Sequence, residues 1–214
     1  IPYESLAAAI KEQAIINADE TRHLENNKTN WAWIATNDKL TVLMLDESRS
    51  QKSAKKLLGE NFSGVLITDR YCAYNIVNIL QRQLCWSHLT RDFIRISERQ
   101  GKAAKVGEEL LFYQKRIFYY WHKYKSGFIN FCQLGKAIEV IQISFRSCLI
   151  NALTCGHSRT VNTCKNILKC FVALWTFSKV KGVEPTNNHG ERQIRGFVIY
   201  RKFSFGTRSK RGTR

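Results

Sequence analysis

The stretch Gly182-Val-Glu-Pro-Thr-Asn-Asn-His-Gly-Glu-Arg-Gln-Ile-Arg195 has the composition of a helix start near the end of the chain. Pro185 suits the first turn of a helix, and Thr186 or Asn187 can serve as its cap. On a helix that begins here, Glu191 lies about one turn in. The stretch therefore predicts one carboxylate at a defined place on a late helix.

Two earlier stretches, residues 15–21 and 64–71, are short apolar runs that each reach an aspartate, Asp19 and Asp69. Two acids at strand ends and one on a late helix match the needs of two-metal phosphoryl transfer, in which each Mg²⁺ takes carboxylate and phosphate oxygens. The alternative is that Asp69 caps the helix after it and that Asp19 is a solvated loop acid. Glu20 also competes with Asp19 for the role.

The pattern of apolar residues predicts five strands and two helices in the first hundred residues. The expected strands are 14–23, 31–36, 40–45, 64–68 and 81–85, and the expected helices are 50–58 and 86–99. Pattern alone favours a mixed α/β fold. Along the chain, the expected elements are three strands, a helix, two further strands and a helix.

Residues 102–180 contain no proline and no strand alternation, and helices are expected at 110–124, 137–150 and 161–177. An all-helical insertion before the last helix is the simplest interpretation. The expected organisation runs along the chain as a leftover upstream segment (1–13), the first part of the catalytic core (14–100), the helical insertion (101–180), the final catalytic helix (181–205) and a basic tail (206–214).

Several motifs, in this order, resemble the catalytic region of the insertion-sequence-66 family of DDE transposases. They are Asp19-Glu-Thr21, Trp31-Ala-Trp33, Gly64-Val-Leu-Ile-Thr-Asp-Arg-Tyr-Cys-Ala-Tyr-Asn75, Cys85-Trp-Ser-His-Leu-Thr-Arg-Asp-Phe93, Glu184-Pro-Thr-Asn-Asn-His-Gly-Glu-Arg192 and Arg201-Lys-Phe-Ser-Phe-Gly206. The resemblance implies a ribonuclease-H-like mixed sheet with flanking helices. It also selects Asp19 over Glu20.

The resemblance further implies that Asp19, Asp69 and Glu191 hold Mg²⁺ or Mn²⁺ and catalyse strand cleavage and strand transfer at transposon ends. His88 is a weaker catalytic candidate, since histidine suits proton transfer near neutral pH. A buried structural histidine is the alternative. The implied partners are transposon-end and target DNA, with a possible homo-oligomer on the DNA.

The chain carries 34 Lys and Arg against 17 Asp and Glu, a net charge of +17, which predicts a polyanionic partner such as nucleic acid. No acid follows Glu191, and basic residues with interleaved aromatics suit a DNA backbone. The candidate phosphate contacts are Arg192, Arg195, Arg201 and Lys202. The alternative for the last two is that they only hold the final helix in place.

No apolar run is long enough to span a membrane, and the seven cysteines are scattered without a Cys-x-x-Cys pair. Reduced cysteines and a cytoplasmic, DNA-associated protein of bacterial type are expected. The chain lacks an initiator Met and the family's amino-terminal part, so a truncated, catalytically silent remnant that binds DNA non-specifically is one alternative. A ribonuclease-H-type nuclease acting on RNA–DNA hybrids is the other.

Overall fold

The computed structural model describes residues 2–25 and 28–204, the side chains of Lys202 and Ser204 excepted. The chain divides into two compact units. The sheet unit takes residues 1–85 and 186–214, and the helical unit takes residues 86–185. The helical unit therefore includes the helix that follows the fifth strand, which the sequence analysis grouped with the core.

The sheet unit contains a five-stranded sheet with the order β3-β2-β1-β4-β5. Its strands are β1 (Ile15–Glu25), β2 (Lys28–Thr36), β3 (Thr41–Asp46), β4 (Val65–Thr68) and β5 (Arg82–Leu84). The first three strands are antiparallel neighbours, whereas β4 is parallel to β1 and β5 is parallel to β4. The fold class expected from the sequence, a mixed α/β sheet of ribonuclease-H-like order, is confirmed.

One face of this sheet forms the hydrophobic core with α1 (Tyr3–Lys11), α2 (Gln51–Leu58) and a short 3-10 helix, η1 (Cys72–Ile76). Alternate residues of a strand project to opposite faces, so Ala18 reaches this core and its neighbour Asp19 faces away. Residues 3–11 fall in the segment expected to be left over from something upstream. They form α1, and Ile10 is fully buried in the core.

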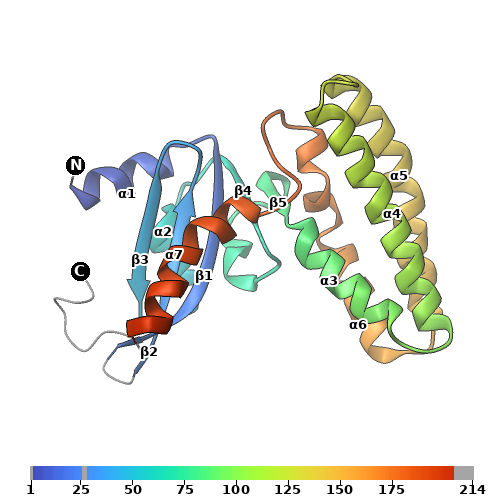
Figure 1. The fold of residues 1–214 in the computed structure, drawn as a ribbon, viewed down its shortest axis with the longest axis horizontal. Helices are drawn as coiled ribbons and strands as arrows, with labels where there is room; N and C mark the ends of the chain where they lie inside the picture. The colour runs from blue at the N-terminus through green and yellow to red at the C-terminus, as the bar shows by residue number, and fades with distance from the viewer. Residues whose placement is uncertain (1, 26–27, 205–214) are drawn as a thin grey trace. The chain divides into compact units, whose positions relative to one another are not determined.

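The last helix, α7 (Asn188–Ser204), contacts β1 and β2 (Figure 1). His189 at its start lies within hydrogen-bond distance of the Asn37 carbonyl (3.1 Å) and the Thr36 hydroxyl (3.4 Å), at the end of β2. Thr36 pairs with Asn17, two residues before Asp19. The helix therefore begins against the face of the sheet to which Asp19 points.

The helical unit contains four α-helices and three short 3-10 helices (Figure 1). They are α3 (Trp86–Ser97), α4 (Lys102–Lys125), α5 (Phe131–Asn151), η3 (Ala152–Thr154), α6 (Ser158–Lys169), η4 (Phe171–Leu174) and η5 (Thr176–Ser178). Trp86, Phe145 and Trp175 pack ring against ring at its centre, with centroids 5.3–5.7 Å apart. Gly107 lets α4 approach the backbone of α3, since a Cβ there would lie 2.2 Å from the Ser97 nitrogen.

The predicted helix at 161–177 is wrong in its second half, because α6 ends at Lys169 and two 3-10 turns follow. Residues 173–178 are all buried. A helix on the surface of a unit buries one stripe only, so a stretch buried on every side does not continue it. Among the described residues, no helix has the length and apolar character needed to cross a membrane.

Candidate active site

Asp19 lies within β1, opposite Ile34 of β2, and its side chain is partly buried on the α7 face of the sheet. Its Oδ1 atom accepts a hydrogen bond of 2.9 Å from the backbone amide of Glu20. A strand position with a partly buried carboxylate is not a solvated loop. The loop-acid alternative for Asp19 is therefore wrong.

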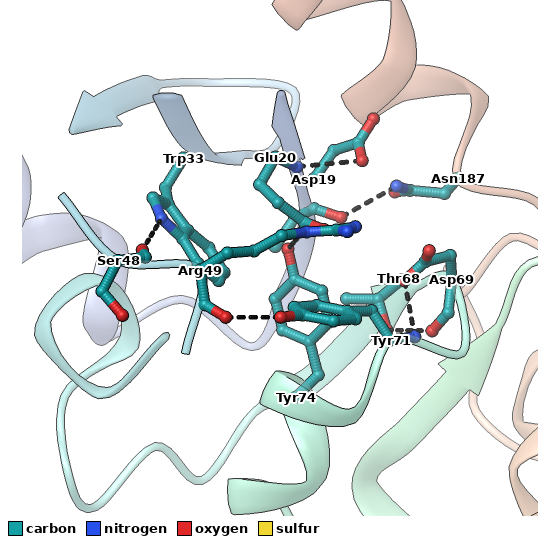
Figure 2. A network of polar contacts seen from close by, with 11 residues as sticks. Asp19, Glu20, Trp33, Ser48, Arg49, Thr68, Asp69, Tyr71, Tyr74 and Asn187 are labelled. Atoms are coloured by element: carbon teal, nitrogen blue, oxygen red, sulfur yellow. Dashed lines mark hydrogen bonds and ion pairs between the residues drawn. The ribbon is translucent and has the colours of Figure 1, made fainter. Parts of the chain in front are cut away.

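Asp69 directly follows β4. The parallel register of β1 and β4 ends with Asn17 opposite Ile67, and Asp19 and Asp69 each come two residues after this last pair. The Oδ1 atom of Asp69 accepts the Tyr71 amide at 2.8 Å (Figure 2). This bond closes a local turn, but Asp69 does not cap the helix after it, because the N-cap of η1 is Tyr71 and no side chain caps that helix. A carboxylate can accept further bonds, so this contact leaves room for a ligand.

Glu191 lies in the first turn of α7, and its amide donates to the Asn187 carbonyl at 3.0 Å. Asn187 occupies the expected cap position, but its side chain binds the sheet: its Nδ2 donates to the Ala18 carbonyl at 2.9 Å (Figure 2). Its Oδ1 accepts from the Asn17 side chain, also at 2.9 Å. Asn187 is 1% exposed, so these bonds are shielded from water. They fix the start of α7, and with it Glu191, against the strand that carries Asp19.

The charges of these acids act on one another. The pKa of Asp19 is raised to about 7, first by burial and then by the carboxylates of Glu20, Asp69 and Glu191, while the Glu20 amide acts in the opposite direction. Like charges oppose ionisation only when they lie close together. Asp69 and Glu191, from distant segments of the chain, therefore lie near enough to Asp19 for their charges to act on it. That the three carboxylates form one site stays a prediction.

Glu20 points to the opposite face of the sheet from Asp19. Its two oxygens accept hydrogen bonds from Arg49 (2.6 and 3.0 Å) and from the Tyr74 hydroxyl (2.5 Å), and its side chain is 2% exposed. Burial raises the pKa of Glu20, and the bonds from Tyr74 and Arg49 act against that rise. Both carboxylate oxygens of Glu20 are therefore already bonded within the protein. This agrees with the family motif, which selects Asp19 rather than Glu20 as the candidate metal-binding carboxylate.

Among the candidate phosphate contacts, Arg192 and Arg195 are exposed on α7. Arg201 has partners in the protein: its guanidinium donates to the Thr21 hydroxyl at 3.0 Å and to the Arg22 carbonyl. These bonds favour the view that Arg201 holds the last helix to β1. The side chain of Lys202 and the basic tail at 206–214 lie outside the described residues.

His88 lies on α3 in the helical unit and is partly buried. Its role in proton transfer stays a prediction.

The seven cysteines are all free, as expected, and burial raises the pKa of the Cys164 thiol to about 11. His157 caps α6 by accepting from the Thr160 amide at 3.3 Å, which gives it a structural role.

Three residues near the candidate site, Asn17, Arg49 and Tyr74, were not predicted from the sequence. Asn187 was predicted as a helix cap, but the bonds of its side chain to the sheet were not. Asn17 carried a signal, since an amide in the buried middle of an apolar strand needs a partner. Arg49 and Tyr74 carried none, because their contacts join segments that are distant in sequence.

The model of the Transposase IS66 family matches residues 2–214. Comparison with curated proteins and comparison with solved structures each yield no match. The family match covers both units and every motif discussed above. The chain therefore belongs to the IS66 family of transposases, nucleic-acid-processing enzymes whose partner is DNA.

Proposed function

We propose that the sheet unit cleaves and rejoins DNA strands at transposon ends by metal-dependent phosphoryl transfer, with Asp19, Asp69 and Glu191 as the catalytic carboxylates. The observation that carries this proposal is the geometry: Asp19 lies on β1, Asp69 follows the adjacent parallel strand β4, and two bonds of Asn187 hold the start of α7 to β1. Burial, together with the charges of Glu20, Asp69 and Glu191, raises the pKa of Asp19 to about 7, in agreement with this arrangement. Negative charge concentrated in this way is unfavourable unless a cation or a proton neutralises it. Family membership supplies the substrate class, DNA.

The donor set fits Mg²⁺ or Mn²⁺. All three side chains offer carboxylate oxygens, the ligands that hard divalent cations prefer, and the site contributes too few donors to enclose an ion fully. Substrate phosphate oxygens and water would complete the coordination. Bound ions supply activation of water or a 3′-hydroxyl and stabilisation of the leaving oxygen.

The protein's own side chains position the acids and bind the substrate phosphates. Asn187 orients α7 through its bonds to Asn17 and Ala18, which holds Glu191 toward the sheet. The exposed guanidinium groups of Arg192 and Arg195 can bind phosphates beside the acid on the same helix. Positioning and charge neutralisation account for most of the catalysis in phosphoryl transfer.

The test is strand cleavage of supercoiled plasmid by the full chain with Mg²⁺ or Mn²⁺. Asp69→Asn is expected to abolish cleavage and to leave DNA binding intact or slightly stronger, because a negative charge near phosphate is removed. Asp38→Asn is the matched control, since Asp38 is exposed in the β2–β3 turn. Unchanged cleavage by Asp69→Asn would remove that residue from the mechanism.

Two other outcomes of the same assay would replace the proposal. Binding without cleavage under any metal condition would identify a silent DNA-binding remnant. Cleavage of RNA–DNA hybrids without cleavage of duplex DNA would identify a ribonuclease-H-type nuclease.

A further inference from the structure

Arg49 lies between β3 and α2, and its side chain contacts the segments that carry Asp19 and Asp69 (Figure 2). On the β1 side, its Nε and Nη2 atoms donate to Glu20 at 3.0 and 2.6 Å. The same Glu20 donates its backbone amide to the Asp19 carboxylate at 2.9 Å. Arg49 therefore holds the residue that orients Asp19.

On the β4 side, the guanidinium carbon of Arg49 lies 3.9 Å from the centroid of the Tyr71 ring. The same carbon lies 4.7 Å from the Trp31 ring of β2. The Tyr71 hydroxyl also donates to the Arg49 carbonyl. The amide of Tyr71 in turn donates to the Asp69 carboxylate at 2.8 Å. Arg49 therefore holds the residue that orients Asp69 as well.

We call this group the Arg49 bracket; its residues are Glu20, Trp31, Arg49, Tyr71 and Tyr74. Its anchor is rigid, since Tyr74 is fully buried and bonds the second oxygen of Glu20 at 2.5 Å. Arginine suits the position because a planar guanidinium can stack on aromatic rings while it donates from two nitrogens. Lysine offers neither the plane nor the paired donors.

We propose that Arg49 is a positioning residue that fixes the separation of Asp19 and Asp69, and thereby the affinity of the site for a divalent cation. This inference rests on the metal-dependent function proposed above. Arg49 contacts neither carboxylate side chain by hydrogen bond among the described residues, so it acts through Glu20 and Tyr71. Residues that orient metal ligands commonly change metal affinity about 10–100-fold when they are replaced.

A purely electrostatic role makes the opposite prediction. Arg49 and Asp69 lie close enough for the carboxylate to raise the pKa of the guanidinium, an effect smaller than those of burial and Glu20. A positive charge near a cation site weakens cation binding. Replacing Arg49 by a neutral residue would then tighten metal binding, whereas loss of positioning weakens it.

The experiment is a Mn²⁺ titration of the full chain, with free Mn²⁺ read by electron paramagnetic resonance at one fixed pH. The variants are Arg49→Met, which is neutral, and Arg49→Lys, which keeps the charge. Lys56→Met is the matched control, since Lys56 pairs with Asp46 at 2.5 Å on α2 and β3, and none of the ion pairs in the described part of the chain joins it to a bracket residue. Asp19→Asn reports on the site itself.

Both Arg49 variants are expected to weaken Mn²⁺ binding by about tenfold or more, with Lys56→Met unchanged. Unchanged or tighter binding in Arg49→Met would overturn the inference. If Arg49→Met does not give the wild-type circular dichroism spectrum, the inference is judged on Arg49→Lys instead. Unchanged or tighter Mn²⁺ binding by that variant would then overturn it. A wild-type protein that binds no Mn²⁺, or binds it equally well after Asp19→Asn, would instead overturn the proposed function.

Discussion

Asp19 and Glu20 are neighbours in one strand, yet their surroundings differ because successive side chains of a strand face opposite sides. Glu20 is bonded to Arg49 and Tyr74. Asp19 faces Asp69 and Glu191, whose charges add to the effect of burial on its pKa. Two neighbouring acidic residues thus have different parts: Glu20 belongs to the framework and Asp19 to the candidate site.

This environment predicts how Asp19 affects stability in the absence of metal. Its folded pKa of about 7 exceeds the ordinary value of 3.8, so the folded state binds more protons between these limits. The contribution of Asp19 to stability is therefore fully present below about pH 4 and is lost as the pH rises through 7. Asp19→Asn should stabilise the metal-free protein at pH 8 by on the order of 2 kcal/mol and should flatten this pH dependence.

Urea unfolding in EDTA at pH 5 and at pH 8 measures the effect. The exposed control Asp38→Asn should leave the difference between the two pH values unchanged. Equal pH dependence in wild type and Asp19→Asn would show that Asp19 titrates normally.

At the scale of elements, the start of α7 is the part that assembles the site. The side chain of Asn187 is buried and bonded to β1, and Gly190 lies directly over it. A Cβ at Gly190 would lie 2.9 Å from the Asn187 Oδ1 and 3.2 Å from its Nδ2. Because Asn187 is held by two buried bonds, it cannot move aside without breaking them.

We therefore predict that Gly190→Ala lowers metal-dependent strand cleavage by roughly tenfold or more, through displacement of Glu191. Gly196→Ala on the same helix is the control, since a Cβ there meets nothing within 4 Å. It should keep full cleavage and gain up to about 1 kcal/mol of stability from helix propensity. Equal cleavage by the two variants would show that the Asn187 contact does not position the acid.

The strands could be predicted from the sequence, because apolar runs mark them locally, whereas the ribonuclease-H-like arrangement came from the family resemblance. The three acids were candidates because each follows or lies within such an element, but only the family motif selected Asp19 over Glu20. The Asn187 anchor and the Arg49 bracket could not, since both depend on contacts between residues far apart in the chain. The end of α6 was misplaced because apolar spacing does not reveal that residues 173–178 are buried on every side.

At the scale of the whole molecule, the net charge of +17 is expected to dominate the affinity for DNA. Each phosphate that a cation neutralises contributes about −0.9 to the slope of log affinity against log salt. Arg192 and Arg195 are exposed, whereas Arg201 is bonded to β1. Substitution of the exposed arginines and substitution of Arg201 should therefore have different effects on the salt dependence of DNA affinity.

We predict that Arg192→Gln with Arg195→Gln flattens the salt slope by roughly two and weakens all duplex sequences alike. Arg201→Gln should leave the slope unchanged and cost about 1 kcal/mol of stability through its lost hydrogen bonds. Binding titrations at several salt concentrations measure the salt slope of each variant, and urea unfolding measures its stability. A strong preference for one sequence, or a slope that changes only with Arg201→Gln, would contradict this assignment.

The central claim is that Asp19, Asp69 and Glu191 together bind divalent cations. The most direct measurement is a crystal structure of the full chain with Mn²⁺, in which anomalous scattering locates the ions. We expect anomalous density contacted by oxygens of all three carboxylates, with two ions about 3.5–4 Å apart when DNA phosphate is also bound. Anomalous density at other residues only, or carboxyl carbons of any pair separated by more than roughly twice that spacing with Mn²⁺ and DNA present, would contradict it.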